Sequence, residues 1–435
     1  MSTSYQPAQA WRVAVLLIVY MIINFADKIA VGLLAVPMMG EMKLSPSAFG
    51  LIGSSFFWLF AIAGIGGGFI ANRVASTGLL LAMAVAWSAL QIPMALSSSI
   101  GVLILARVLL GIAEGPAWPV SVHALFKWFP NHKRELPVAW LAQGGALGLL
   151  GAGIVMPLIT AHWGWRMNFL ALAAAGMLWS ILWLAFGREG MGAEADTHIV
   201  VPDAHTRVPY RRLLLEPTIL ACFLLKFVAY WSLALILTWM PVYLQRGLGF
   251  SGVTSGRVYA AIIALSMPLS VGGSWLARKM LERGVSSRMA RGRFSAALVG
   301  FGGVAFVCLW LTDCGPVWRV LLIALTFGLS QVIYSVGPAM LAEVSPASQR
   351  GAILAIDNSI ASVAGVLAPL LTGLMVQRLT GGAGYEAGFA LCGILMIIGA
   401  LTGAFAIDPG RAASRIRADL ASAGTAAARS TPIAS

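Results

Sequence analysis

The stretch WRVAVLLIVYMIINFADKIAVGLLAVPMM, from Trp11 to Met39, decides the fold class of this chain. It is apolar and long enough to cross a lipid bilayer as a helix. Asp27 and Lys28 nevertheless lie in its interior. A charge near the centre of a membrane helix is costly, and it persists mainly where it pairs with another charge or lines a watery cavity. The stretch therefore predicts a membrane helix that carries functional residues.

A second apolar stretch has the same property. IGVLILARVLLGIAEGPAWPVSVHALF, from Ile100 to Phe126, contains Arg107 and Glu114. These two residues are seven positions apart, which is nearly two helical turns, so they share one helix face. Together with the acid and the base of the first stretch, they are the leading candidates for a functional site.

The composition indicates a helical membrane protein with many spans. The 435 residues are 59% hydrophobic and only 10% charged, and their mean hydropathy is +0.86. Soluble proteins carry about 25% charged residues. The N-terminal stretch lacks the charged start and the cleavage site of a signal peptide, so we expect it to remain in the protein. The four cysteines are scattered, and the five histidines lack ligand spacing, so no metal site is expected.

Apolar runs of roughly 20 residues predict twelve membrane spans. They are expected near 13–38, 48–70, 78–97, 100–126, 136–160, 166–187, 217–244, 255–277, 293–312, 317–342, 351–377 and 385–407. One long polar break divides them into halves. The predicted domains are a six-helix bundle over 1–187, a linker over 188–214, a second six-helix bundle over 215–410 and a tail over 411–435.

The distribution of lysine and arginine predicts the orientation in the membrane. Of the 29 such residues, twenty fall on the side of the N-terminus, six on the opposite side and three within spans. Cytoplasmic loops carry the excess of positive charge, so both termini, the linker and the tail are predicted to be cytoplasmic. The net charge of +13 is then mostly a topology signal. It does not indicate a nucleic-acid partner, and a bacterial-type inner membrane is the expected location.

The two halves resemble each other. GGFIANR ends at Arg73 before the third span, and GGSWLAR ends at Arg278 before the ninth. The loops after the fourth and tenth spans carry Arg134 and Arg350, each four residues after a proline. Two parallel six-span repeats are typical of the major facilitator architecture. The four arginines are predicted to act in cytoplasmic gating.

Depth estimates suggest that the four intramembrane charges form one network. At about 1.5 Å per residue, Asp27 and Lys28 lie between Arg107 and Glu114 in depth. Asp27 is then expected to reach Arg107, and Lys28 to reach Glu114. An anion that competes for either cation would release a carboxylate to take a proton, which links anion binding to proton uptake. The alternative is a pair of static bridges that only hold helices together.

At these residues the chain resembles the anion:cation symporter family of the major facilitator superfamily. INFADK (Ile23 to Lys28) looks like the first-helix pattern of that family, and RVLLGIAEGPAWP (Arg107 to Pro119) is similar to its fourth-helix signature. Shorter matches extend over nearly the whole chain. They are WFPNHKR, GWRMNF, WMPVYL and QRGAILAIDN. The resemblance implies proton-coupled uptake of a small organic carboxylate, such as a sugar acid or an aromatic acid.

The resemblance also implies roles for individual residues. Lys28 stands where the family usually has an arginine that binds the substrate carboxylate, and Arg107 matches its coupling arginine. Asp27 and Glu114 match its protonatable acids. Gln143 in the fifth span matches a polar substrate contact, and Asn358 a polar position in the eleventh.

Three departures from the family pattern stand out. Lys28 offers a point charge in place of a bidentate guanidinium. The gating motif over 68–77 has lost its acid, which is replaced by Asn72, so the outward-open state is expected to be latched differently. Phe60 stands where many relatives carry a tyrosine that faces the substrate, and this favours a less hydroxylated substrate than a sugar acid.

Other residues have a structural interpretation as well as a functional one. Phe60 and Trp118 are candidates for the wall of an aromatic-acid pocket, although such residues more often face lipid or pack in a core. Lys226 is expected to extend to the inner headgroups rather than to contact substrate. Asp357 is expected near Arg350, as a gate or helix-end charge.

These observations together predict an all-α secondary transporter that takes up an organic carboxylate with protons by alternating access. It is predicted to act as a monomer in the lipid bilayer, with the proton gradient as its energy source and without a cofactor. The alternative is a membrane sensor that binds such an anion without moving it. An enzyme is not expected, because no nucleophile–base pair or metal constellation appears in the sequence.

Overall fold

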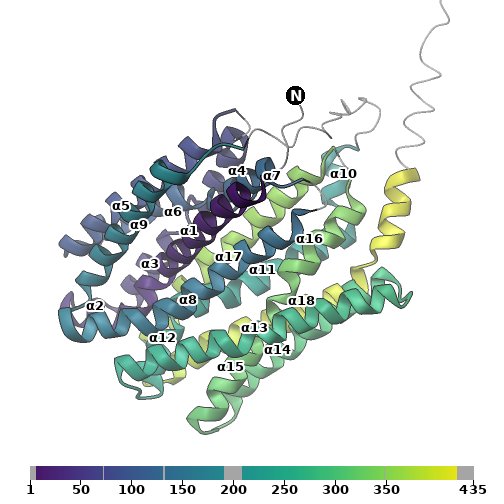
Figure 1. Cartoon of the computed structure of the whole chain (residues 1–435). Helices are drawn as coiled ribbons and strands as arrows, with labels where there is room; N and C mark the ends of the chain where they lie inside the picture. Colours follow the sequence, from purple (N-terminus) through teal and green to yellow (C-terminus); the bar gives the residue numbers. More distant parts are fainter. Residues whose placement is uncertain (1–5, 72, 131–132, 191–207, 347, 419–435) are drawn as a thin grey trace, which may run out of the picture. The chain divides into compact units, whose positions relative to one another are not determined.

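The computed structural model describes residues 6–71, 73–130, 133–190, 208–346 and 348–418, which are almost entirely helical (Figure 1). Within these residues, twelve helical stretches are long and apolar enough to cross a membrane, so the prediction of twelve spans is confirmed. The first six are α1 (Pro7–Leu33), α3 with α4 (Pro46–Ser55 and Phe60–Ala71), α5 (Ser76–Leu96), α6 with α7 (Ile100–Glu114 and Ala117–Trp128), α8 (Glu135–Trp163) and α9 (Arg166–Phe186).

The other six spans follow the polar break in the sequence. They are α11 (Pro217–Thr238), α13 (Gly252–Glu282), η4 with α14 (Arg288–Arg293 and Phe294–Leu311), α15 with α16 (Pro316–Ser330 and Val332–Val344), α17 (Arg350–Arg378) and α18 (Ala383–Ala406). Short helical turns lie between spans, namely α2 (Ala35–Glu41), α10 (Tyr210–Leu214), α12 (Met240–Val242) and the π-helical η3 (Tyr243–Gly247). The predicted linker lies mostly, and the predicted tail largely, outside the described residues.

Prolines explain where two spans end earlier than predicted. The first span was expected to reach residue 38, but α1 ends at Leu33 because Pro37 has no N–H to donate to the Leu33 carbonyl. The seventh span was expected to reach residue 244. It ends at Thr238 for the same reason, since Pro241 cannot donate to the carbonyl four residues earlier. In both places a short separate helix continues the chain.

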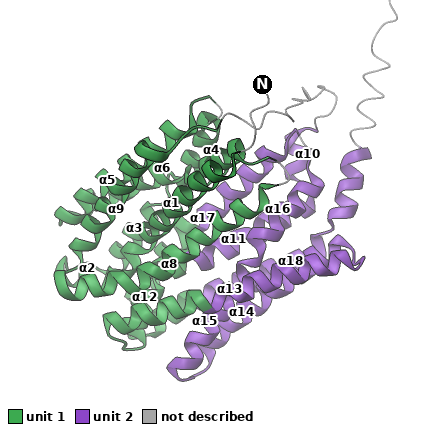
Figure 2. Ribbon diagram, viewed as in Figure 1, with its two compact units in different colours: residues 1–196, 234–264, 365–388 green, residues 197–233, 265–364, 389–435 purple. Residues whose placement is uncertain are grey.

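The described chain divides into two compact units (Figure 2). Unit 1 contains residues 1–196, 234–264 and 365–388, and unit 2 contains residues 197–233, 265–364 and 389–435. These units do not follow the predicted halves, because unit 1 includes parts of α11, α13 and α17. The division of the sequence into two six-helix bundles therefore stays a prediction.

Close backbone contacts hold the late segments of unit 1 against its early helices. A Cβ atom at Gly32 would overlap the carbonyl oxygen of Leu237, and one at Gly50 would lie 2.6 Å from the carbonyl oxygen of Pro369. Trp239 donates its indole N–H to that same Pro369 oxygen at 2.9 Å. Small residues allow such approach between membrane helices.

In unit 1, α1 packs along α8 and α9, and α5 packs against α9 and α6. Gly144 and Gly148 of α8 face the backbone of α1 so closely that a side chain would collide with it. The core beside them is aromatic, with the ring of Tyr20 centred 4.5 Å from that of Trp87 and 4.7 Å from that of Trp179. This packing fixes α1, which carries half of the intramembrane charges.

In unit 2, α14 packs against α15. Thr326 donates its hydroxyl to the carbonyl oxygen of Gly302 at 2.9 Å across this contact. The rings of Phe306 and Phe389 stack with their centres 5.4 Å apart. The core of unit 2 is thus a second, separately packed helical assembly.

Candidate functional site

The four predicted charges lie together in the interior of unit 1. Asp27 and Lys28 come from α1, and Arg107 and Glu114 come from α6. Arg107 is 2% exposed and Glu114 is 1% exposed. Each acid interacts electrostatically with both cations. The prediction that these residues form one cluster is confirmed, and we call it the charge network.

Two amide side chains connect the charge network. Asn24 donates to Glu114 Oε2 at 2.8 Å and accepts from Lys28 Nζ at 2.7 Å. Gln91 of α5 donates to Asp27 Oδ2 at 2.5 Å. Both amides are buried. An amide can join charged groups of either sign because it carries both a donor and an acceptor.

The expected direct ion pairs are wrong in detail. Among the described residues, no ion pair joins Asp27 to Arg107 or Lys28 to Glu114. Asn24 joins Lys28 to Glu114, and Asp27 accepts a hydrogen bond from Gln91. Asn24 lies one helical turn before Lys28, which makes its carbonyl the nearest acceptor. Gln91 was not predicted, and its only signal in the sequence is a lone amide within an apolar span.

The two acids of the charge network are direct neighbours. The carboxyl groups of Asp27 and Glu114 lie close enough to hydrogen bond to each other when one of them carries a proton. Asp27 Oδ1 and Glu114 Oε1 have no other donor among the described residues. The site thus contains a carboxyl pair that can share a proton.

Arg107 is a buried cation without a hydrogen-bonded acceptor. Its Nε has no partner, and its side chain makes no hydrogen bond or ion pair with any described residue. The guanidinium instead lies over the ring of Phe56, 4.6 Å from the ring centre. Buried polar groups are almost always satisfied, so an unsatisfied buried cation needs a specific explanation. An anionic ligand supplies the acceptors that the protein does not.

Aromatic rings surround the other cation. The Lys28 ammonium lies 4.4 Å from the ring centre of Phe25 and 5.3 Å from that of Phe60. Both distances suit a cation–π interaction. The predicted place of Phe60 at the site is therefore supported by a contact with Lys28.

Glycines of α6 and its continuation bring the aromatic side of α3 and α4 to the cations. A Cβ at Gly111 would overlap the carbonyl oxygen of Phe56, and one at Gly115 would overlap that of Phe60. Pro116 follows immediately and breaks the fourth span into α6 and α7. The GIAEGP sequence thus places Glu114 at a helix end where neighbouring backbones approach closely.

The remaining predicted binding residues make no hydrogen bond, ion pair or ring contact with the charge network in the described part of the chain. Trp118 is 43% exposed, and its place in a pocket wall stays a prediction. Gln143 is half-buried in α8 and makes no hydrogen bond with a described residue. Asn358 is exposed in unit 2. Its neighbour Asp357 is buried instead.

The predicted gating arginines differ in their surroundings. Arg134 donates to the carbonyl oxygens of Phe129 and Phe126 at 2.9 and 3.1 Å, which closes the end of α7. Arg278 forms an exposed pair with Glu282 at 2.7 Å. Arg73 and Arg350 are exposed and form no ion pair with the described residues. Their role in gating stays a prediction.

Lys226 and Asp357 form a buried ion pair in unit 2. Lys226 Nζ lies 2.8 Å from Asp357 Oδ2, and the two side chains are 9% and 1% exposed. The expectation that Lys226 extends to the headgroups was wrong, and so was the placement of Asp357 as a helix-end charge. The sequence placed each on its helix but gave no sign that they meet.

Glu189 holds together the region beside the decayed gating motif. It accepts hydrogen bonds from the backbone N–H groups of Ser76 and Thr77 at 3.1 and 2.9 Å, and it pairs with Lys127. Partial burial alone would raise the pKa of Glu189, but these partners lower it to about 2. An acid that follows α9 therefore binds the start of α5, whereas Asn72 itself lies outside the described residues.

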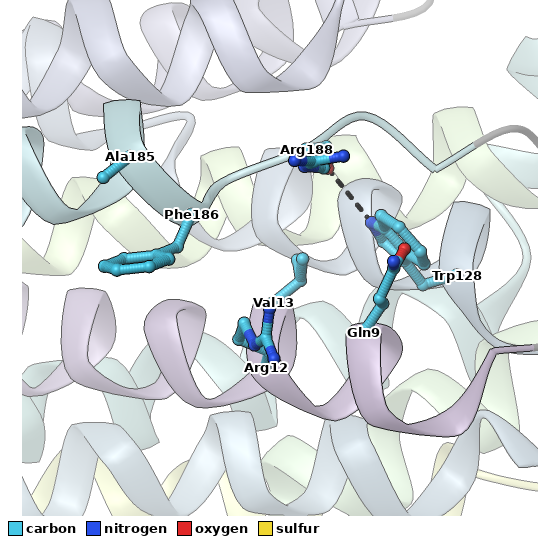
Figure 3. Close-up of a pocket in the computed structure, with 7 residues that line it drawn as sticks. All are labelled: Gln9, Arg12, Val13, Trp128, Ala185, Phe186 and Arg188. Atoms are coloured by element: carbon cyan, nitrogen blue, oxygen red, sulfur yellow. Dashed lines mark hydrogen bonds between the residues drawn. The ribbon is translucent and has the colours of Figure 1, made fainter.

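A cavity of about 100 Å³ lies elsewhere in unit 1, at the ends of α1, α7 and α9 (Figure 3). Its lining residues are Gln9, Arg12, Val13, Trp128, Ala185, Phe186 and Arg188. The Trp128 indole donates to the Arg188 carbonyl oxygen at 3.2 Å. No member of the charge network lines this cavity, so it is separate from the candidate site.

Twelve apolar helices among the described residues, together with a buried charge network in which Arg107 makes no hydrogen bond, define a multi-pass membrane protein of the transporter class. Residues 16–334 match the Major Facilitator Superfamily, and the chain belongs to this family. The chain is thus a transporter and not an enzyme, and its fold is the one predicted.

Three known proteins illustrate this relationship. The chain is 28% identical to the hexuronate transporter of Bacillus subtilis, over 87% of this chain and 90% of that protein. It is 27% identical to a probable sulfoacetate transporter of Cupriavidus necator, over 89% and 91% of the two chains. A bacterial homologue of the human lysosomal transporter Spinster shares the fold, with a TM-score of 0.77 at 18% identity over 94% of this chain and 99% of that one. These relatives agree with the resemblance to the anion:cation symporter family.

Proposed function

We propose that this protein takes up a small organic carboxylate together with protons. The observation that carries the proposal is the Arg107 guanidinium, which is buried without an acceptor beside two carboxyl groups that can share a proton. A buried guanidinium whose hydrogen-bond donors are unsatisfied is costly, so its persistence favours a ligand that supplies acceptors. A carboxylate fits the planar fork of an arginine with two parallel hydrogen bonds.

The arrangement links anion binding to proton uptake through shared charges. Before the anion binds, Arg107 interacts electrostatically with both Asp27 and Glu114. A bound carboxylate pairs with Arg107. One of the two negative charges on the acids is then no longer balanced by a cation. Taking up a proton between Asp27 and Glu114 restores the balance. Anion and proton therefore favour each other's binding, which is the thermodynamic requirement for symport.

Lys28 supplies the second positive charge of the site. Its ammonium is bound to Asn24, which in turn binds Glu114, so a change at any of the three reaches the others. The rings of Phe25 and Phe60 lie against the same ammonium. We assign Lys28 to anion binding and, through Asn24, to communication with the protonatable acid.

The wider setting of the proposal follows from the sequence and the relatives. The excess of lysine and arginine on the side of the termini supports a cytoplasmic location of both termini, and we place the protein in a bacterial-type inner membrane. The proposal needs no cofactor beyond the proton gradient, and one chain is taken as the working unit. Relatives named for hexuronate and sulfoacetate transport support a small organic anion as the cargo.

Transport in a reconstituted system tests this function. A thermal-shift screen of purified protein against sugar acids and aromatic acids would first identify a ligand. Counterflow of that labelled acid into proteoliposomes then measures exchange, and an imposed inward proton gradient measures accumulation. We expect exchange without a gradient and accumulation with one. Binding without counterflow would instead identify a membrane sensor. Counterflow without proton-driven accumulation would show that transport is not coupled to protons.

A further inference from the structure

The cavity at the ends of α1, α7 and α9 carries positive charge that no acid of the protein balances. Arg12 of α1 and Arg188, which follows α9, both line it, whereas no aspartate or glutamate does. Neither arginine side chain forms an ion pair or a hydrogen bond with a described residue. The other polar side chains of the lining, Gln9 and Trp128, are uncharged. Two guanidinium groups at one cavity therefore lack an anionic partner in the described part of the chain.

The acid beside Arg188 in the sequence has other partners. Glu189 accepts hydrogen bonds from the backbone N–H groups of Ser76 and Thr77. It also pairs with Lys127. A pKa of about 2 keeps Glu189 ionised for these partners at neutral pH. Glu189 thus balances the charge of Lys127, and the charge of Arg188 stays available for a ligand.

The backbone around Arg188 is fixed, so the cavity is formed before a ligand binds. The Trp128 indole donates to the Arg188 carbonyl oxygen at 3.2 Å, as Figure 3 shows. Before it in the chain, the Gly187 N–H donates to the Trp183 carbonyl oxygen at 2.7 Å. After it, Glu189 is bound to the start of α5. A preorganised site spends less free energy on ordering itself when it binds.

The cavity lies where membrane spans end. Its residues come from the first two turns of α1, the last residue of α7, the last two residues of α9 and the segment that follows. These helices belong to the first, fourth and sixth spans. Span ends lie among the lipid headgroups, where tryptophans such as Trp128 are enriched, and the excess of lysine and arginine predicts that this end is cytoplasmic. The anions concentrated at that surface are lipid headgroups.

Apolar side chains continue from the cavity along two helices. On α1, Val15 and Val19 share a helix face with Arg12. On α9, Leu182 shares a face with Phe186, which itself lines the cavity. All four apolar side chains are exposed. A ligand with an anionic head and apolar tails matches this arrangement, whereas a soluble anion would leave the apolar faces uncovered.

The size of the cavity limits the ligand group that enters it. Its volume is about 100 Å³, and pockets that enclose a whole drug-sized molecule have about 300–1,000 Å³. The cavity therefore holds one compact group, with the rest of the ligand outside. A phosphate is such a group, and guanidinium groups bind it through parallel, charge-assisted hydrogen bonds.

We propose that Arg12 and Arg188 bind the phosphate of an anionic phospholipid, whose acyl chains lie along the exposed apolar faces of α1 and α9. Trp128 is a positioning residue that holds the backbone of Arg188 at the cavity. The site contains no member of the charge network, so it goes beyond the proposed transport and does not depend on it.

Three probes test the ligand class. Native mass spectrometry of the purified full-length protein gives the dissociation constant of the first bound molecule. The probes are phosphatidylglycerol, phosphatidylcholine with the same acyl chains, and glycerol 3-phosphate, which has no acyl chains. Phosphatidylglycerol should bind at least about tenfold more tightly than either. Equal affinity for phosphatidylcholine would overturn recognition of the anionic head, and equal affinity for glycerol 3-phosphate would identify a soluble phosphate as the ligand instead of a lipid.

Matched arginine variants test the location. Arg12→Gln/Arg188→Gln should weaken phosphatidylglycerol binding about thirtyfold, because each arginine near an anionic lipid contributes about a fivefold factor. Its affinity for phosphatidylcholine should be unchanged, which also shows that the variant is folded. The control Arg283→Gln/Arg417→Gln removes two exposed arginines of unit 2 that form no ion pair with the described residues. It should stay within about twofold of wild type, since distant sites act independently. An equal loss in both double variants, or no loss in the first, would overturn the site.

Discussion

The charge network of unit 1 and the ion pair of unit 2 solve the problem of buried charge in opposite ways. In the network, Asn24 joins Lys28 to Glu114, and Arg107 has no hydrogen-bonded acceptor. In the pair, Lys226 binds Asp357 directly. A direct pair is self-sufficient in charge, whereas the network leaves the hydrogen-bond donors of one cation unused. The difference indicates that the network has a cation available for an anion, whereas the ion pair of unit 2 does not.

The largest effect is expected from breaking the pair of unit 2. Lys226→Met leaves Asp357 buried and unpaired, and such a change costs about 3–5 kcal/mol of the free energy of unfolding. Thermal unfolding in detergent should show a large drop in the midpoint. Lys226→Met/Asp357→Leu should recover most of it. If the single variant is as stable as the wild type, Asp357 does not depend on Lys226, and the pair does not stabilise unit 2 as described.

The next effect concerns the available cation of unit 1. Arg107→Gln should weaken carboxylate binding by roughly a hundredfold, because losing a buried charged contact costs about 3 kcal/mol. It should destabilise the protein less than Lys226→Met, because Arg107 has no bonded acid to leave unpaired. Titration calorimetry and thermal unfolding measure both quantities, and Arg73→Gln at an exposed position is the control. Unchanged affinity would show that the anion binds at a site other than Arg107.

Removing the protonatable acid should separate binding from coupling. Glu114→Gln keeps the hydrogen bond from Asn24 through its amide oxygen but cannot ionise. We expect proton-driven accumulation in proteoliposomes to fall to the level of passive exchange, with counterflow within a few-fold of wild type. The matched variant Glu343→Gln alters an acid of a partly exposed pair in unit 2 and should accumulate normally. Unaltered uphill uptake by Glu114→Gln would remove its role in coupling.

A smaller effect is expected at the second cation. Lys28→Ala removes a positive charge and the hydrogen bond to Asn24, so anion affinity should fall at least tenfold, which is about 1.4 kcal/mol. Lys28→Arg restores the charge with a bidentate fork and should bind a carboxylate at least as tightly as wild type. Wild-type affinity in Lys28→Ala would exclude this residue from the site.

The smallest effect is expected outside the membrane spans, where solvent screens charge. The pKa of Glu189 is lowered to about 2 from an ordinary 4.5, so its contribution to stability is complete above about pH 4.5 and is lost as the pH falls toward 2. Because Glu189 is partly exposed, we expect a contribution of about 1 kcal/mol. Glu189→Gln should therefore lower the unfolding midpoint at neutral pH and flatten its decline in acid. Parallel declines in both proteins would show that the pair with Lys127 is not what stabilises this region.

Hydropathy was sufficient to predict the spans, because each membrane helix must satisfy its own backbone and cover itself with apolar side chains. The same rule made Asp27, Lys28, Arg107 and Glu114 visible, since a charge contradicts its apolar surroundings. Helix ends shifted where a proline removes a donor, as at Pro37. Hydropathy alone does not show this end, because apolar residues continue beyond the proline.

Interactions between residues of different helices could not be predicted from single spans. Asn24 joins Lys28 to Glu114, and Gln91 binds Asp27, because of the rotation and spacing of α1, α5 and α6. A linear sequence does not state either quantity. Lys226 and Asp357 are 131 positions apart, and each had a separate local explanation. Depth along a helix is a one-dimensional estimate, whereas pairing depends on which faces meet.

The meeting of Gly153 and Gly256 inside unit 1 has a practical consequence. A methyl group at Gly256 would overlap the carbonyl oxygen of Gly153, and the gap there accommodates hydrogen atoms only. Alanine at this position therefore acts as a wedge that raises the energy of this one arrangement of helices without touching a charged residue. Antibody fragments raised against the alanine variant would therefore recognise conformations that the unmodified protein adopts too rarely to be captured.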